Sequence, residues 1–136
     1  MLVDRTAFAR ARAELGTGFV RILGYFREDG VKSVAAIEAA VRAGNAAALV
    51  IPAHTLKGEA RQFGAKPLAD LAERIEMLAR DCVERQDKPD EAVTLAARLR
   101  LLFERTLALL ERESSPPAMR RPGTGGFGRR ATPGGY

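Results

Sequence analysis

A single histidine and the residues on the following helical turn are the part of this sequence best suited to chemistry. The segment 51–65, IPAHTLKGEARQFGA, contains His54, then Lys57 and Gly58, and closes near Gly64. On a helix, positions i, i+3 and i+4 share one face. That face would present an imidazole, a neighbouring ammonium group and a position without a side chain. These features suit a histidine that carries a phosphoryl group and is approached closely by another protein.

The neighbours of His54 decide between this hypothesis and an ordinary surface histidine. Glycine inside a helix costs ~1 kcal/mol relative to alanine, and access to His54 would explain Gly58 there. Lys57 would stabilise a phosphorylated imidazole through charge-assisted hydrogen bonds. Arg61 extends the positive strip by one turn, and Val50 lies on the same outer strip one turn before His54.

The histidine is expected on the outer surface of its helix. The apolar residues of segment 46–63 recur at intervals of four and three, as the core face of a helix requires; they are Leu49, Ala53, Leu56, Ala60 and Phe63. At about 100° per residue, the cluster around His54 lies roughly 130° from this stripe.

Similar periodicity predicts six helical segments in all. They span 4–14, 17–28, 30–43, 46–63, a segment that begins near Pro67, and one from near Pro89 to about Glu113. Asp4 is expected to cap the first helix, and Gly64 to end the fourth in a left-handed conformation. Connections are short and no alternating β pattern competes. The sequence therefore predicts an all-α fold, an antiparallel four-helix bundle with additional N-terminal helical segments.

Composition indicates one domain, at 1–113, followed by a tail at 114–136. The net charge is +5, but the tail holds four arginines and no acid, which leaves 18 basic and 17 acidic groups in 1–113. The Gly/Pro/Arg-rich tail is expected to be disordered.

No apolar run is long enough for a membrane span and no secretory signal is visible, so a cytoplasmic protein without a membrane partner is expected. One cysteine, Cys82, and one histidine argue against a metal site. Cys82 is expected in the core.

The segment around His54 resembles the histidine-containing phosphotransfer (HPt) domains of bacterial multistep two-component phosphorelays. The family motif is close to H-x-L-K-G with a glycine six residues later, and here it reads His54-Thr55-Leu56-Lys57-Gly58, then Gly64. The resemblance extends to the helical layout over about 17–110. It implies an HPt-type bundle that acts as a phosphocarrier and not as an enzyme.

The resemblance also assigns roles. His54 would be the phosphoacceptor, Lys57 would hold the phosphoryl oxygens, and Gly58 would leave room for the partner. Gln62 is a weaker candidate, at a position where such domains often carry an amide. Glu59 stands where a small residue is common, and it could pair with Arg61 or repel phosphate.

The chain has no Gly-rich phosphate loop, so no ATP site and no cofactor are expected. The resemblance implies response-regulator receiver domains and a hybrid sensor histidine kinase as partners, with Mg²⁺ on the receiver. The phosphoryl group would pass from a receiver aspartate to His54 and on to another receiver. A monomer is expected.

Docking is predicted around His54, with Val50 and Arg61, and on apolar side chains of the second helix; these are Phe19, Ile22, Leu23 and Phe26. The alternative that all four are core residues stays open.

Three other functions remain open at this stage. The chain could be a docking module of the same fold without phosphotransfer, a fragment of a chemotaxis-type kinase, or a nucleic-acid binder that acts through its basic tail. We expect no nucleic-acid partner, and deletion of 114–136 would separate the last function from the others.

Glu73 and Glu76 are interpreted as solvated charges beside Arg74 and Arg80. The proline at position 52, inside a predicted helix, is expected to bend that helix or to mark its effective start.

Overall fold

The computed structural model describes residues 1–114, and every regular element in this part of the chain is a helix. The elements are α1 (Arg5–Leu15), a short 3-10 turn (Gly16–Gly18), α2 (Phe19–Arg42), α3 (Ala47–Gln62), α4 (Lys66–Arg85) and α5 (Ala92–Ser114). The prediction of an all-α bundle with an additional N-terminal helix is confirmed. The predicted tail lies outside the described residues, except for Ser114, which ends α5.

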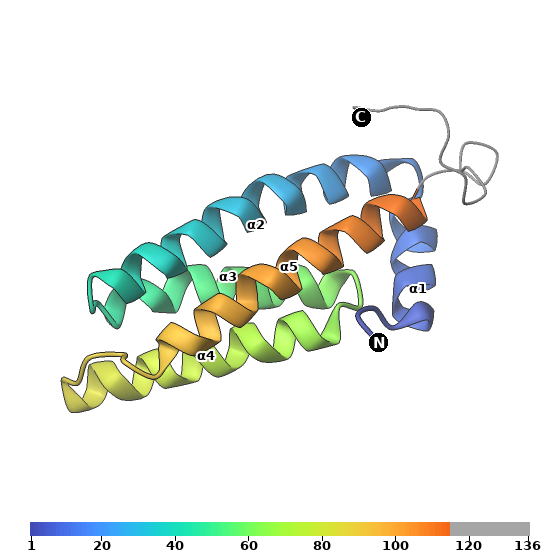
Figure 1. The fold of residues 1–136 in the computed structure, drawn as a ribbon. Helices are drawn as coiled ribbons and strands as arrows, with labels where there is room; N and C mark the ends of the chain where they lie inside the picture. The colour runs from blue at the N-terminus through green and yellow to red at the C-terminus, as the bar shows by residue number, and fades with distance from the viewer. Residues whose placement is uncertain (115–136) are drawn as a thin grey trace.

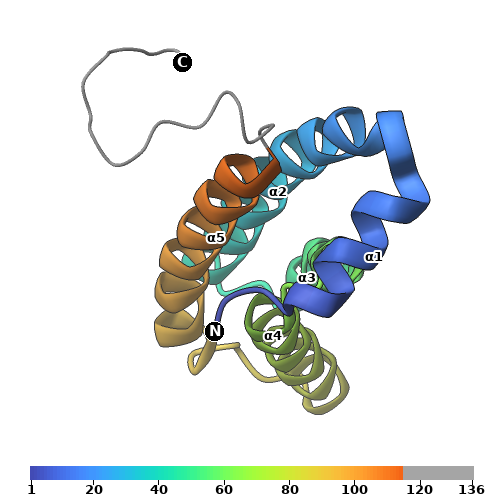
Figure 2. The same cartoon turned by 90° about the vertical axis from the view of Figure 1, so that its right-hand side faces the viewer.

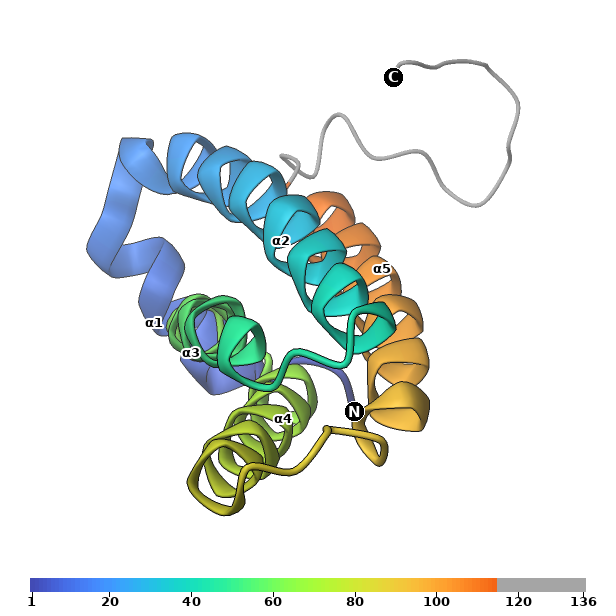
Figure 3. The same ribbon diagram turned by 90° about the vertical axis from the view of Figure 1, so that its left-hand side faces the viewer.

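Helices α2 to α5 form an antiparallel four-helix bundle, and α1 lies across one end of it (Figure 1). In the two end-on views, α2 packs beside α3 and α5, and α4 closes the ring between α3 and α5 (Figures 2 and 3). Helices α3 and α5 are therefore diagonal to each other. None of the helices in residues 1–114 combines the length and the apolar character needed to cross a membrane.

Helix α2 is one continuous helix of 24 residues, so the prediction of two segments separated near position 30 is wrong. Gly30 lies inside the helix and is buried against α5. A Cβ atom at this position would meet the ring of Phe103 at 2.3 Å. The absence of a side chain thus lets α2 and α5 approach closely, and this packing outweighs the helix cost of glycine.

The end of α3 and the beginning of α1 are joined. Gly64 adopts φ +72°, as predicted from the sequence, and its carbonyl accepts a hydrogen bond of 2.8 Å from the amide of Asp4. Asp4 caps α1, as predicted, because its Oδ1 accepts hydrogen bonds from the amides of Thr6 and Ala7. Any side chain at position 64 would also meet Ala7. This junction fixes α1 beside the C-terminal end of α3.

A series of aromatic rings fills the core between α1, α2, α5 and the end of α3. The ring centroids of Phe8 and Phe19 lie 5.5 Å apart, and those of Phe19 and Phe63 lie 5.6 Å apart. Phe26 contacts both Phe63 and Phe103. Such ring pairs stabilise the fold beyond the burial of apolar area alone. The two rings of α2 thus connect this helix to α1, to the end of α3 and to α5.

Candidate functional site

His54 projects from the outer face of α3, as the periodicity predicts. The helix buries Leu49, Ala53, Leu56 and Ala60 completely. By contrast, the side chain of His54 is 60% exposed. The helix runs through Pro52 without interruption, so this residue does not mark its beginning. The only imidazole of the chain is thus fixed on a rigid element and open to solvent.

A buried carboxylate from the neighbouring helix holds the imidazole. Glu76 of α4 is only 4% exposed, and its Oε2 lies 3.1 Å from Nδ1 of His54. Lys57 places Nζ 2.8 Å from Oε1 of the same carboxylate. Arg80, one turn further along α4, donates to Oε2 from Nε at 3.0 Å and from a terminal nitrogen at 2.8 Å. The interpretation of Glu76 as a solvated charge is therefore wrong: it is the centre of the site.

The charge state of Glu76 determines which nitrogen of His54 keeps a free lone pair. Burial alone would raise the pKa of Glu76, but hydrogen bonds from Lys57, Arg80 and His54 overcome it and lower the pKa to about 2. An ionised carboxylate only accepts hydrogen bonds. Nδ1 of His54 must therefore be the donor. In a neutral ring, this leaves the lone pair on Nε2, which points away from Glu76 and can act as a nucleophile.

Lys57 is close to the imidazole but is less accessible than the sequence suggests. Its side chain is 16% exposed, and its ammonium group faces Glu76. An ammonium group has three donors, so the ion pair with Glu76 leaves two for another anion. The residue is brought to the site, as expected, but as part of a buried charge network.

Gly58, one turn after His54, faces open space. A Cβ atom at this position would have nothing within 4 Å. The glycine is therefore not required by packing inside the protein, in contrast to the glycine buried between α2 and α5.

Comparisons with known proteins agree with this geometry. The family model of the Hpt domain matches residues 21–111. The chain belongs to the Hpt domain family. Its structure is also similar to the crystal structure of histidine-containing phosphotransfer protein B (HptB) from Pseudomonas aeruginosa PAO1. The TM-score is 0.71 and the identity 24%, over 82% of this chain and 93% of that chain. No curated protein sequence matches significantly.

Membership in the Hpt family places the chain among phosphocarrier domains, which act in histidine phosphotransfer within phosphorelays and are not catalytic enzymes. Hpt domains generally interact with receiver domains. The match begins after α1 and covers all four helices of the bundle in part or in full. Helix α1 is thus an addition to the part of the chain that the family model matches.

Two further candidates lie on α3 beyond the Hpt motif. Arg61 pairs with Glu73 of α4 and not with Glu59. Gln62 is exposed at the end of α3, about 12 Å along the helix axis from His54. It lines a shallow groove of about 170 Å³ with Arg10 and Glu14 of α1. The structure therefore does not bring Gln62 to the imidazole.

Glu59 faces α2 and lies beside Asp29. Burial, and then hydrogen bonding and repulsion from Asp29, raise the pKa of Glu59 to about 7. Its carboxyl group thus titrates near neutral pH on the side of α3 next to α2. Of the two alternatives that the sequence left for Glu59, the pairing with Arg61 is not formed, because Arg61 pairs with Glu73.

Most of the apolar residues predicted to dock a partner are part of the core. Phe19, Leu23 and Phe26 are no more than 4% exposed, which corrects the expectation that they form an exposed surface. Ile22 and Val50 are partly buried and pack against the same core. The physical reason is that α2 packs against α1, α3 and α5, so it needs a wider apolar face than a helix with two neighbours.

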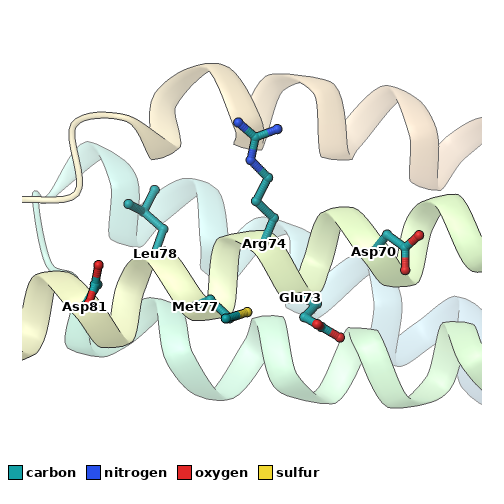
Figure 4. Close-up of a pocket in the computed structure, with 6 residues that line it drawn as sticks. All are labelled: Asp70, Glu73, Arg74, Met77, Leu78 and Asp81. Carbon is teal, nitrogen blue, oxygen red and sulfur yellow. The ribbon is translucent and has the colours of Figure 1, made fainter.

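One surface depression in the described residues lies along α4, and His54 is not among its lining residues. It has a volume of about 540 Å³ and is lined by six side chains of α4: Asp70, Glu73, Arg74, Met77, Leu78 and Asp81. Arg74 and Leu78 point toward α5, whereas Glu73 and Met77 point toward α3 (Figure 4). Because one helix supplies all the lining, this is an open helix flank and not an enclosed ligand site.

Proposed function

We propose that this Hpt domain carries a phosphoryl group on Nε2 of His54, accepts it from a receiver-domain aspartate, and passes it to another receiver domain. The observation that carries the proposal is the contact between Glu76 and Nδ1, which directs the free lone pair of an exposed imidazole outward. This contact occurs in a chain whose family performs histidine phosphotransfer.

The transfer step needs only in-line approach of the phosphorylated aspartate. The Nε2 lone pair forms the P–N bond while the P–O bond to the aspartate breaks, and the aspartate leaves as a carboxylate. The proton on Nδ1 stays in its hydrogen bond to Glu76. The positive charge that develops on the ring therefore faces a buried carboxylate, which stabilises the transition state. The reverse step returns the phosphoryl group to a second aspartate.

Lys57 and Gly58 have complementary roles in this proposal. The ammonium group of Lys57 forms an ion pair with the carboxylate that also contacts the imidazole. Its two remaining N–H groups can donate hydrogen bonds to phosphoryl oxygens. Gly58 leaves the space through which the receiver brings its aspartate. Mg²⁺ would be held by the receiver. A hybrid sensor kinase would supply the phosphoryl group to the first receiver.

The test is incubation with phosphorylated receiver domains and Mg²⁺, with wild type compared to His54→Gln. We expect acid-labile, alkali-stable label on the wild type and none on the variant. Absence of label on folded wild-type protein across a panel of receivers would refute phosphotransfer. It would leave a docking module of the same fold.

A further inference from the structure

Three exposed arginines form a straight row along the outer side of α5. Arg98, Arg105 and Arg112 are seven residues apart and exposed. Seven residues are almost two turns, so consecutive members of this arginine row lie about 10.5 Å apart along the helix axis and differ by only about 20° around it. The row is therefore about 21 Å long and runs nearly parallel to the helix.

The arginine row is unpaired, in contrast to the other flank of α5. Toward α2, Arg100 binds Glu38 and Glu104, and Glu111 binds Arg27. Within residues 1–114, the members of the row form no ion pair and no side-chain hydrogen bond. The flank of α5 next to α2 is thus neutralised inside the protein, and the other flank carries three unpaired cations.

The neighbouring side of α4 does not neutralise the row. Asp70 and Asp81 bind Lys66 and Arg85 of their own helix. Arg74 points toward α5 (Figure 4) and adds a further cation to this edge. The edge between α4 and α5 is therefore cationic.

The stability of α5 itself accounts for only one end of the row. Arg112 lies in the last turn of the helix, where a cation interacts favourably with the helix dipole. Arg98 and Arg105 lie further inside the helix, beyond the reach of this effect. Their position calls for an interaction outside the bundle.

An apolar strip accompanies the arginine row. Ala97, Leu101 and Ala108 are exposed on α5, and Leu101 is 56% exposed. Leu101 lies within about 60° of Arg98 and Arg105 around the helix axis. Helix α5 packs against α2 and α4, and no other helix of residues 1–114 covers its outer side (Figure 2). The small side chains on both sides of Leu101 would let another helix approach closely.

We propose that the outer face of α5 docks an amphipathic helix of a partner protein. Carboxylates at seven-residue spacing on that helix face the arginine row, and its apolar residues contact Leu101. A second helix alongside α5 reproduces the period of the row residue for residue, as in the charged flanks of coiled coils. A nucleic-acid duplex carries one charge per about 1.7 Å of its axis, so it would not select this spacing.

This chain does not itself supply the acidic helix. Residues 115–136 contain four arginines and no acidic side chain, so this segment has the wrong charge for the row. On α4, seven-residue spacing gives Asp70, Met77 and Glu84, with only two carboxylates, and Asp70 already binds Lys66. Contact between α4 of one copy and α5 of another would also be heterologous, and such contacts extend into open chains unless the rotation closes.

The proposed site is separate from the imidazole site. Helix α5 lies diagonal to α3, which carries His54 (Figure 3). A helix bound to α5 would therefore leave His54 accessible, and both faces could be occupied at once. The inference does not depend on phosphotransfer, so each proposal can fail without the other.

The first experiment measures binding of a synthetic helical peptide to the full chain. The peptide has about 25 residues, enough for an isolated helix, with glutamate at every seventh position beside a strip of leucines. An isomer of the same composition has its glutamates at intervals of five, which scatters them around the helix. We expect the seven-spaced peptide to bind at least tenfold tighter than the isomer. Binding should weaken as salt screens the exposed charge pairs, and ¹⁵N amide shifts should concentrate on α5.

The double variant Arg98→Gln/Arg105→Gln tests the row directly. It removes two exposed charges and should weaken binding of the seven-spaced peptide roughly fivefold, as expected for two exposed ion pairs. The matched control, Arg10→Gln/Arg21→Gln, removes the same charge from exposed arginines of α1 and α2 and should bind like the wild type. The amide spectra of both variants report whether they are folded.

Several results would overturn the proposal. They are equal affinity for the two peptides, wild-type affinity of the Arg98→Gln/Arg105→Gln variant, an equal loss in the control, or amide shifts away from α5. Tighter binding of a short DNA duplex than of the seven-spaced peptide, lost in the same variant, would assign the row to nucleic acid instead. Self-association in sedimentation equilibrium that this variant abolishes would assign it to a second copy of the chain.

Discussion

The carboxylate of Glu76 lies 3.1 Å from Nδ1 of His54, although 22 residues and a helix connection separate the two in the chain. The same carboxylate binds Lys57 and Arg80, so one buried group fixes the orientation of the imidazole and balances two cations. The relative position of α3 and α4 therefore sets the geometry of the site.

Replacement of Glu76 should affect both the tautomer and the rate. Glu76→Gln offers an amide that can also donate to Nδ1, so the Nδ1–H tautomer loses its preference. We expect a 10- to 100-fold slower transfer, as for other groups that orient an active imidazole. Because the chain has one histidine, ¹⁵N NMR of the imidazole reports the tautomer without overlap. Glu84→Gln, an exposed position on α4, is the control, and an unchanged tautomer in Glu76→Gln would contradict the assignment.

The same carboxylate should make stability depend on acid. The pKa of Glu76 is lowered to about 2 in the folded protein, below its value in the unfolded chain, so its contribution is present above about pH 4.5. That contribution is lost as the pH falls toward 2. Urea unfolding should show wild type more stable than Glu76→Gln at pH 5, with the difference shrinking at lower pH. A constant difference over this range would argue against an ionised Glu76.

Glu59 should have the opposite dependence on pH. Its pKa is raised to about 7, so the folded state binds the proton more tightly than the unfolded chain. Stability should fall as the pH rises from about 4.5 to 7 and then level off. Glu59→Gln should remove this fall and stabilise the protein at pH 8 by about 1 kcal/mol, since solvent screening reduces the effect of a half-buried group. Glu28→Gln, exposed on α2, should leave the fall in place.

Alanine at position 58 should separate folding from partner access. Its Cβ meets nothing within 4 Å, so Gly58→Ala should stabilise the protein by up to ~1 kcal/mol through helix propensity. Transfer from a receiver should nevertheless fall at least tenfold, because the methyl group occupies space that the partner needs. Gly24→Ala is the matched control, since a Cβ there also meets nothing, and it should gain stability without loss of transfer. Equal transfer by both variants would remove the role of Gly58 in access.

The sequence predicted the parts of this molecule that depend on local pattern. The 3- and 4-residue spacing of apolar residues gave the helices and placed His54 outside the core, and Asp4 and Gly64 marked helix ends through capping chemistry. The division of α2 near Gly30 was wrong because propensity says nothing about the ring on α5 that needs this space.

The sequence could not identify the centre of the site. Glu76 follows Ile75, at the border of the apolar stripe of α4, and periodicity does not decide between a solvated and a buried position there. Its spacing of four from Arg80 was visible, but its contacts with His54 and Lys57 depend on how α3 and α4 are aligned. In the same way, Phe19 and Phe26 could be assigned to the core only once the neighbours of α2 were known.

The close approach of Gly30 to Phe103 has a consequence for the evolution of this chain. A methyl group at position 30 would overlap the ring, so position 30 cannot gain a side chain while Phe103 stays in place. Among homologues with the same helix spacing, we expect these two positions to covary. Alanine or serine at position 30 should appear together with a smaller residue at position 103, and lineages with an aromatic residue there should retain the glycine.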